Sequence, residues 1–168
     1  MPEQKMSISF RVDSGVIEHN NREIIAANVD PARINDNIAY TQIDLRSFYH
    51  QLFDEALAEY NDKQNRADRK IPDYYEHIKK SGNAKLFYEV VVQFGDMQDC
   101  GLSSENWKTS QTMLNEYMQE FEKRNPNLKV FNAVMHLDES TPHLHIDFVP
   151  VSKKNAKGLA VKNSMSGA

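Results

Sequence analysis

A histidine-rich stretch near the end of the chain limits the possible folds more than any other feature, because it predicts two antiparallel strands joined by a tight turn. In the segment 143–150, polar and apolar residues alternate as they do in a strand. The segment 130–137 is also strand-like, and Asp138–Pro142 between them has the composition of a turn. These residues therefore predict a β-hairpin, whose polar side would carry His143, His145 and Asp147.

The register of this hairpin would bring three histidines together. If His136 pairs opposite His143, then Val134 lies opposite His145 on the same face of the sheet. Imidazole is the most common metal-binding side chain, and three of them over one patch of sheet favour a metal site. A single strand histidine is more often an ordinary core or surface residue, so the prediction depends on all three converging.

The composition fits one globular domain, and we expect residues 1–168 to form it. A hydrophobic content of 40% is sufficient for a core in a chain of this length. Cys100 is the only cysteine, which excludes a disulfide framework and a thiolate metal cluster. No apolar run has the length of a membrane span, and Met1–Lys5 does not resemble the start of a signal peptide. We therefore expect a cytoplasmic protein.

The net charge of the chain says less about a nucleic-acid partner than the positions of its charged residues do. A net charge of −4 argues mildly against a nucleic-acid partner, because such proteins are usually basic. Local patches attract DNA, however, whatever the mean charge. After Val151 the chain contains four lysines and no acidic residue, namely Lys153, Lys154, Lys157 and Lys162. We predict that Lys153 and Lys154 contact DNA, and the alternative is a solvated tail.

The chain predicts five strands and three helices. The strands alternate or are rich in β-branched and aromatic residues, and they are expected at 6–12, 39–44, 86–94, 130–137 and 143–150. The helices carry apolar stripes and are expected at about 44–61, 72–78 and 105–123. Asp44 and either Ser103 or Ser104 are the expected N-caps of the first and last helix.

This order of elements predicts an α+β fold with two layers. Helices would cover one face of a five-stranded, mainly antiparallel sheet and leave the other face free for the histidines and a substrate. The segment 86–94 is the most strand-like and is expected to be central. Residues 19–37 are expected to be mostly loop, and residues 155–168 are expected to be flexible.

Two motifs resemble those of a known family. The run His-Leu-Asp-Glu-Ser-Thr-Pro-His-Leu-His at 136–145 is similar to the third motif of the Mob/Pre relaxases, the MobV group of plasmid mobilisation and recombination proteins. The run Glu-His-Asn-Asn-Arg at 18–22, with Asp-Pro-Ala-Arg-Ile-Asn at 30–35, resembles the first motif. The resemblance covers roughly residues 6–160, and the third motif is the more specific of the two.

The resemblance implies a fold and a reaction. Relaxases belong to the HUH endonucleases, which have a five-stranded antiparallel sheet with the histidine pair on a central strand. They nick single-stranded DNA at a plasmid transfer origin and hold the 5′ end covalently. The family's proteins are longer, so this chain is expected to be the N-terminal catalytic part of a plasmid-encoded bacterial protein. A homodimer would then form through a C-terminal region absent here.

The resemblance also implies roles for single residues. His19 matches the position from which relaxases with this motif attack phosphorus, and the motif contains no tyrosine. The nearest tyrosines, Tyr40 and Tyr49, have ready structural roles on a strand and a helix. Glu139 is expected to accept the proton of the nucleophile or to orient it, whereas Asp138 is expected to cap the turn.

The remaining residues of the expected site contact the DNA and the metal. Asn20, Arg22 and Arg33 are expected to contact DNA, because a guanidinium meets a phosphate with two hydrogen bonds. The alternative role of either arginine is a surface ion pair. His136, His143 and His145 are the expected metal ligands. Three imidazoles by themselves would suit Zn²⁺, while the resemblance implies Mn²⁺ or Mg²⁺.

Three other functions are compatible with parts of this pattern. A rolling-circle replication initiator or a transposase of the HUH class would carry a tyrosine after the histidine pair, but the last tyrosine here is Tyr117. A non-catalytic module that binds single strands by stacking would need aromatic residues on the sheet face, where this chain has histidines. A small metal hydrolase is distinguished by its turnover of small phosphodiesters.

Overall fold

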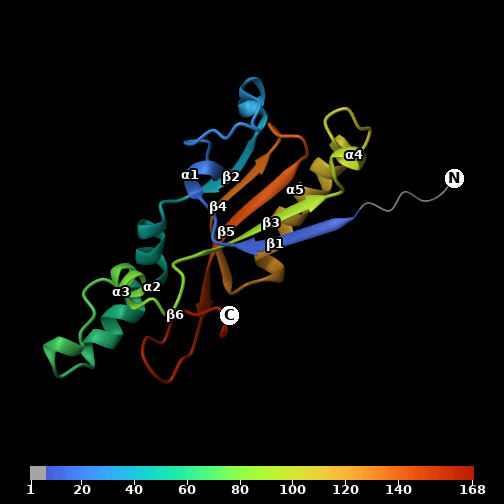
Figure 1. Cartoon of the computed structure of the whole chain (residues 1–168). Helices are drawn as coiled ribbons and strands as arrows, with labels where there is room; N and C mark the ends of the chain where they lie inside the picture. Colours follow the sequence, from blue (N-terminus) through green and yellow to red (C-terminus); the bar gives the residue numbers. More distant parts are fainter. Residues whose placement is uncertain (1–6) are drawn as a thin grey trace.

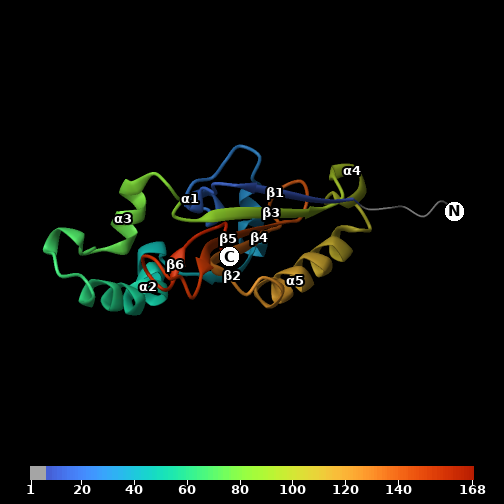
Figure 2. The ribbon, with the colours of Figure 1, turned by 90° about the horizontal axis from the view of Figure 1, so that it is seen from below.

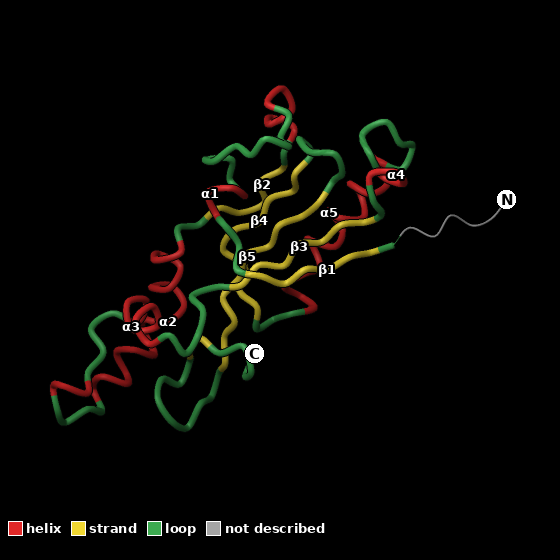
Figure 3. Tube along the Cα trace, viewed as in Figure 1, coloured by secondary structure: helices red, strands yellow, loops and turns green. Residues whose placement is uncertain are grey.

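An antiparallel sheet with the strand order β1-β3-β5-β4-β2 forms the centre of the molecule (Figures 1 and 3). The computed structural model describes residues 7–168, so Met6 of the predicted first strand and the Met1–Lys5 segment lie outside the described residues. The five strands of this path are β1 Ile8–Asp13, β2 Ile38–Gln42, β3 Tyr88–Phe94, β4 Leu128–His136 and β5 His143–Ser152. A short sixth strand, β6 Lys162–Asn163, pairs with the far end of β5. The predicted antiparallel α+β fold is confirmed.

The central strand is β5, and the prediction that 86–94 is central was wrong by one position. All ten residues of β5 are buried, and the strand pairs with β3 on one side and β4 on the other. β3 lies between β5 and the edge strand β1. Both strands are rich in apolar residues, so local sequence shows that each is internal but not which one occupies the middle.

The β4–β5 hairpin has the predicted register. His136 lies opposite His143, and Val134 lies opposite His145. Farther along the hairpin, the register shifts between Val130 and Asn132. Phe131, at this irregularity, joins a different core cluster from Val130. The hairpin therefore contributes to two separate cores.

The first core lies between the sheet and the long helix α5 Trp107–Arg124. Leu114 and Phe121 of this helix pack against apolar side chains of the internal strands, including Val92, Leu144 and Ile146. The predicted cap was wrong: the N-cap is Asn106, which makes no side-chain capping bond. Ser104 instead accepts the backbone N–H of Asn106 and so stabilises the turn that precedes the helix.

The second core lies beyond one end of the sheet, where α2 Leu45–Asp62 and α3 Tyr74–Ser81 pack on the end of β5 (Figure 1). Asp44 caps α2 as predicted, by accepting the N–H of Ser47. Asp73 caps α3 in the same way, and Gly82 ends it with a φ of 65°, a conformation that favours glycine.

The face of the sheet that carries the histidines is not free, which corrects the expectation of helices on one face only. With the sheet nearly edge-on, Figure 2 shows α5 on one side and α1 Ile17–Asn20 on the other. A loop and the 3-10 helix η1 Pro31–Asp36 follow α1. Two further short elements are η2 Ala67–Arg69 and α4 Met97–Cys100.

The segment after Asn155, expected to be unstructured, contains the strand β6. Leu159 is buried in the second core, and the Asn163 side chain donates to the Tyr49 hydroxyl and the Lys85 carbonyl. The local composition does not reveal this order, because it comes from pairing with the end of β5 and from contacts distant in sequence. Across residues 7–168, no helix has both the length and the apolar character needed to cross a membrane.

Candidate active site

Three histidine rings meet on the sheet face that α1 partly covers. His136 comes from β4, and His143 and His145 come from β5. Their ring centroids lie 4.6–5.1 Å apart, and one ligand atom from each lies within 4.8 Å of the others. His136 is fully buried, and the other two are 8% exposed. The predicted convergence is confirmed, but the cluster is much more buried than an open sheet face would be.

Each ring has one nitrogen held by the protein, which leaves the other for a metal. Nε2 of His136 donates to the Asn20 carbonyl at 2.8 Å, and Nδ1 of His143 donates to the Thr141 carbonyl at 2.9 Å. Nδ1 of His145 lies 3.0 Å from the Glu89 carboxylate, and its Nε2 is buried without a partner among the described residues. Such a hydrogen bond on the outer nitrogen is typical of metal-ligating histidines. The donor set therefore fits a divalent metal.

Burial keeps two of these imidazoles, those of His136 and His143, in the neutral form that binds a metal. The pKa of His136 is lowered to about 2, chiefly by burial and then by the nearby His145. Burial and His145 likewise lower the pKa of His143. A neutral ring keeps a lone pair for coordination, so no proton must be displaced near neutral pH.

A buried polar row behind the histidines supports His145. Glu89 of β3, Asp147 of β5 and Asn132 of β4 are neighbours across the sheet. Asn132 and Asn20 both donate to Asp147, and Asn20 also donates to Glu89. A Cβ on Gly15 would come within 2.6 Å of the Glu89 carboxylate, so only glycine allows this close approach.

The two carboxyl groups in this row have different protonation behaviour. Burial and the neighbouring Glu89 raise the pKa of Asp147 to about 7. Burial also opposes the charge on Glu89, but the hydrogen bond and charge of His145 outweigh it and lower the pKa of Glu89. Sequence analysis missed Glu89, although a carboxylate within the apolar run of β3 is a signal that could have identified it.

His19 stands beside the cluster, as expected for the predicted nucleophile. Its ring centroid lies 6.0 Å from that of His136 and 6.3 Å from that of His145. The side chain is half-buried and lines a groove of about 550 Å³ that also reaches His143. Among the described residues no tyrosine lines this groove. Tyr40 instead bonds Asn115 of α5, on the opposite side of the sheet.

Glu139 lies between the three clustered histidines and the α1 segment. Its carboxylate is 3.8 Å from Nδ1 of His136 and 3.8 Å from Nε2 of His143. It accepts hydrogen bonds from Arg22 at 2.8 Å and Asn28 at 2.7 Å. The predicted position near the histidines is therefore correct. Glu139 reaches the α1 segment through Arg22, whose Nη1 is 3.5 Å from Nε2 of His19.

The three predicted DNA contacts near the site are engaged within the protein. The Arg22 side chain is 6% exposed and donates to both Asp138 and Glu139. Arg33 donates to the Leu137 and Glu139 carbonyls. Asn20 is buried in the polar row described above. Arg22 and Arg33 connect the α1 segment and η1 to the hairpin turn. Asn20 connects α1 to the buried polar row.

Asp138 differs from its expected role as a simple turn cap. It is fully buried and accepts hydrogen bonds from Arg22 and Asn37. The predicted DNA-binding lysines, Lys153 and Lys154, are exposed at the opposite end of β5. At about 3.3 Å per strand residue, they lie roughly 25 Å from His145. They are therefore separate from the histidine cluster.

Comparisons with known proteins match these observations. A family model described as plasmid recombination enzyme, Mob_Pre, matches residues 13–166. No curated protein sequence matches the chain. Two similar solved structures are Mn-bound crystal structures of the MobM relaxase domain with 22-nucleotide oriT DNA of plasmid pMV158. One has 24% identity and a TM-score of 0.55 and covers 96% of this chain and 74% of its own. The other has 25% identity and a TM-score of 0.52, with 91% and 74% covered.

Proposed function

The chain belongs to the Mob_Pre family of plasmid recombination enzymes, and from this membership we propose that it nicks one DNA strand at a plasmid transfer origin. It is a DNA-nicking enzyme, a relaxase of plasmid mobilisation. The substrate we propose is supercoiled plasmid DNA in the bacterial cytoplasm, exposed locally as a single strand. The similar relaxase domains are bound to oriT DNA, which supports this assignment.

His136, His143 and His145 would hold the metal of this reaction. The similar relaxase domains are Mn-bound, and the three free ring nitrogens of this site fit a divalent ion. When bound, such an ion supplies positive charge that stabilises the developing charge on the phosphate oxygens. Glu89, Thr141 and the Asn20 carbonyl orient the three rings toward that position.

His19 is the nucleophile in this proposal. A ring nitrogen of His19 attacks the scissile phosphorus, so that a phosphorus–nitrogen bond forms and the bond to the 3′ oxygen breaks. The leaving 3′ oxygen takes up a proton from water. The observation that carries the assignment is the position of His19, about 6 Å from two of the histidine rings in a groove lined by no tyrosine of the described chain.

Glu139 and Arg22 would position this nucleophile. Glu139 pairs with Arg22, and Arg22 lies against His19 and donates to its carbonyl. We assign Glu139 the proton that the His19 ring releases as the new bond forms. Direct contacts to the DNA backbone are assigned to Lys153 and Lys154, because Arg22, Arg33 and Asn20 already bond partners within the protein.

The covalent intermediate tests this proposal. The protein is incubated with Mn²⁺ and a labelled single-stranded oligonucleotide that carries the pMV158 oriT. We expect an adduct on His19 that is lost in acid, because a phosphorus–nitrogen bond is acid-labile. His19→Ala should abolish the adduct, whereas Tyr40→Phe and Tyr49→Phe should keep it. An acid-stable adduct that mass spectrometry maps to a tyrosine would refute the assignment of the nucleophile.

A further inference from the structure

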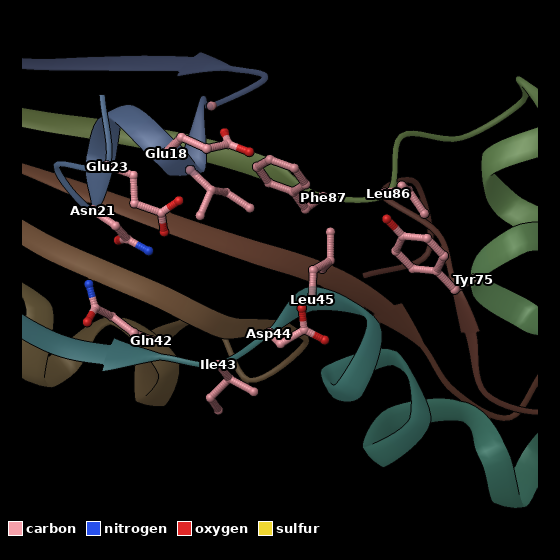
Figure 4. Close-up of a pocket in the computed structure, with 12 residues that line it drawn as sticks. Glu18, Asn21, Glu23, Gln42, Ile43, Asp44, Leu45, Tyr75, Leu86 and Phe87 are labelled. Atoms are coloured by element: carbon pink, nitrogen blue, oxygen red, sulfur yellow. The ribbon is translucent and has the colours of Figure 1, made fainter. Parts of the chain in front are cut away.

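A second hollow lies on the other side of α1 from the histidines. It has a volume of about 720 Å³ and is enclosed by α1, the junction of β2 and α2, and the start of β3 (Figure 4). This volume lies in the range of small-ligand pockets. Ile17, Glu18 and Asn21 of the α1 segment line it, whereas His19 and Asn20 of the same segment face the histidine groove. Gly15 lines both, so the two hollows adjoin.

Four polar side chains of this hollow have no partners within the described chain, whereas the carboxylate of Asp44 caps α2. Figure 4 shows the carboxylates of Glu18 and Glu23 and the amides of Asn21 and Gln42 directed into it. None of these four side chains forms a hydrogen bond or ion pair with another residue of the range 7–168, and Oδ1 of Asn21 is shielded from water without a donor. Glu18, Glu23 and Gln42 are exposed and can bond water, whereas Oδ1 of Asn21 is buried. Leaving a buried acceptor unpaired is costly, and a ligand that donates a hydrogen bond would satisfy it.

The lining defines what kind of ligand fits. No lysine, arginine or histidine from the described residues lines the hollow, so a phosphate would be repelled by Glu18 and Glu23. Leu86 and Phe87 provide an apolar wall. The combination favours a flat, uncharged group that donates hydrogen bonds to carboxylates. A nucleobase with an exocyclic amino group has this chemistry, and carboxylates accept hydrogen bonds from cytosine amino groups in known complexes.

We propose that this hollow binds one unstacked base of the single strand beside the scissile phosphate, and that it selects adenine, cytosine or guanine over thymine. The proposal rests on the nicking function assigned above. The phosphate would lie on the histidine side of α1 and the base on the other, with the strand passing Gly15. Glu23 and Gln42 are specificity-determining residues in this arrangement, because thymine presents no amino group to them.

The test uses binding, so that it does not depend on catalysis. The full chain with Mn²⁺ is mixed with a pool of random-sequence single-stranded oligonucleotides, and the bound fraction is sequenced. We expect one position at which amino-bearing bases exceed thymine by about tenfold, the effect of one good base contact. Glu23→Gln and Gln42→Ala should each flatten the preference at that position alone. Gln119→Ala, an exposed change on α5, is the control.

The outcomes separate this proposal from the nicking function. If the wild type and both variants show the same base preferences, or if thymine is favoured at every position, the base site is refuted. Nicking of the pMV158 oriT oligonucleotide is measured in parallel on the wild type. A protein that selects bases but does not nick would overturn the proposed function, whereas one that nicks with unchanged preferences in the variants would overturn only the base site.

Discussion

The histidine cluster and the tyrosine cluster at the end of the sheet bury similar rings but leave them in different chemical states. Tyr49 and Tyr74 pack with Phe53 in the second core. The Tyr49 hydroxyl donates to the Leu86 carbonyl and accepts from Asn163. Burial raises the pKa of Tyr49 and Tyr74, so both stay protonated and are poor nucleophiles. In the histidine cluster, each ring keeps one nitrogen for a ligand.

The difference shows that burial alone does not mark a functional site. Both clusters are largely shielded from water. Within residues 7–168, the unpartnered atom of the histidine cluster is a ring nitrogen, Nε2 of His145, whereas beside the tyrosines it is an amide oxygen, Oδ1 of Asn163. The tyrosine cluster satisfies its hydroxyl groups internally, which is what a stabilising core requires. We therefore assign chemistry to one region and stability to the other, and the predictions below test that division.

Replacing one histidine should have the largest effect on function. His143→Ala removes one of three ligands, so we expect Mn²⁺ binding and DNA nicking to be lost completely, as measured by calorimetric titration and by gel assay. The metal-free variant should keep the circular dichroism spectrum of the wild type, because the core between the sheet and α5 is untouched. Nicking at the wild-type rate would show that the cluster is not the metal site.

A substitution in the tyrosine cluster should have the opposite effect, because it should lower stability and leave metal binding unchanged. Phe53 is fully buried, and Phe53→Ala should lower the free energy of unfolding by about 3–5 kcal/mol. The folded protein should still bind Mn²⁺ with unchanged affinity, because Phe53 contacts no residue of the metal site. A parallel loss of metal affinity would mean that the two regions are not independent.

Glu89→Gln should weaken the metal site without destroying it. The change removes the negative charge that orients and polarises His145, and losses of this kind lower metal affinity by roughly 10–100-fold. Competition with a coloured chelator measures the affinity. The matched control is Glu55→Gln, an exposed change on α2. Equal metal affinities in the two variants would show that Glu89 has only a structural role.

The pH dependence of stability should also distinguish the clusters. The pKa of His136 is about 2 in the folded protein, against 6.5 for an ordinary histidine. Below pH 6.5 the unfolded chain therefore binds a proton that the folded chain does not, so acid lowers the free energy of unfolding. This one group contributes up to about 1.4 kcal/mol per pH unit. Tyr49 and Tyr74 stay protonated throughout this acidic range, so they do not make the free energy of unfolding depend on pH.

Urea unfolding of the metal-free protein from about pH 6.5 to about pH 4 measures this slope. His136→Gln should have a shallower dependence than the wild type by that amount. Asp147, whose pKa is raised to about 7, acts in the opposite direction. Its folded form keeps a proton that the unfolded form releases, so its stabilisation is lost as the pH rises toward 7. Because Asp147 is present in both proteins, we compare the two slopes, and identical slopes would contradict the assignment.

The smallest effect is expected far from both clusters, at the exposed end of β5. Replacing Lys153, Lys154 and Lys157 with Ala should weaken single-stranded DNA binding and reduce its salt dependence by about 0.7 per lost phosphate contact. Fluorescence anisotropy at several salt concentrations measures the slope. Lys79→Ala with Lys80→Ala, on the exposed end of α3, is the control pair. An unchanged slope in the triple variant would show that the lysines are only solvated.

The elements that the sequence predicted are those determined by local patterns. Alternation and turn composition were sufficient for the register of the β4–β5 hairpin, and with it for the convergence of His136, His143 and His145. The cap Asp44 was likewise predictable, because it stands just before the apolar stripe of α2. The position of His19 beside the cluster followed from the family motif and not from spacing.

The contacts that the sequence did not predict join distant segments of the chain. The partners of Arg22 are an example, because nothing in the local sequence shows that Asp138 and Glu139 lie beside its guanidinium. Glu89 was missed because the pairing of β3 with β5 cannot be seen in either strand. Sequence patterns leave out the order of the strands, and they also missed the short strand β6.

The bond from His136 to the Asn20 carbonyl spans 116 residues, so the histidine cluster is complete only after distant segments of the chain have met. During synthesis α1 and His19 leave the ribosome before the β4–β5 hairpin, because they precede it in the chain. Long-range strand pairing must then close before the rings are held in place. A nascent chain that has not yet released β5 therefore carries His19 without His143 and His145, and we expect that it does not nick DNA.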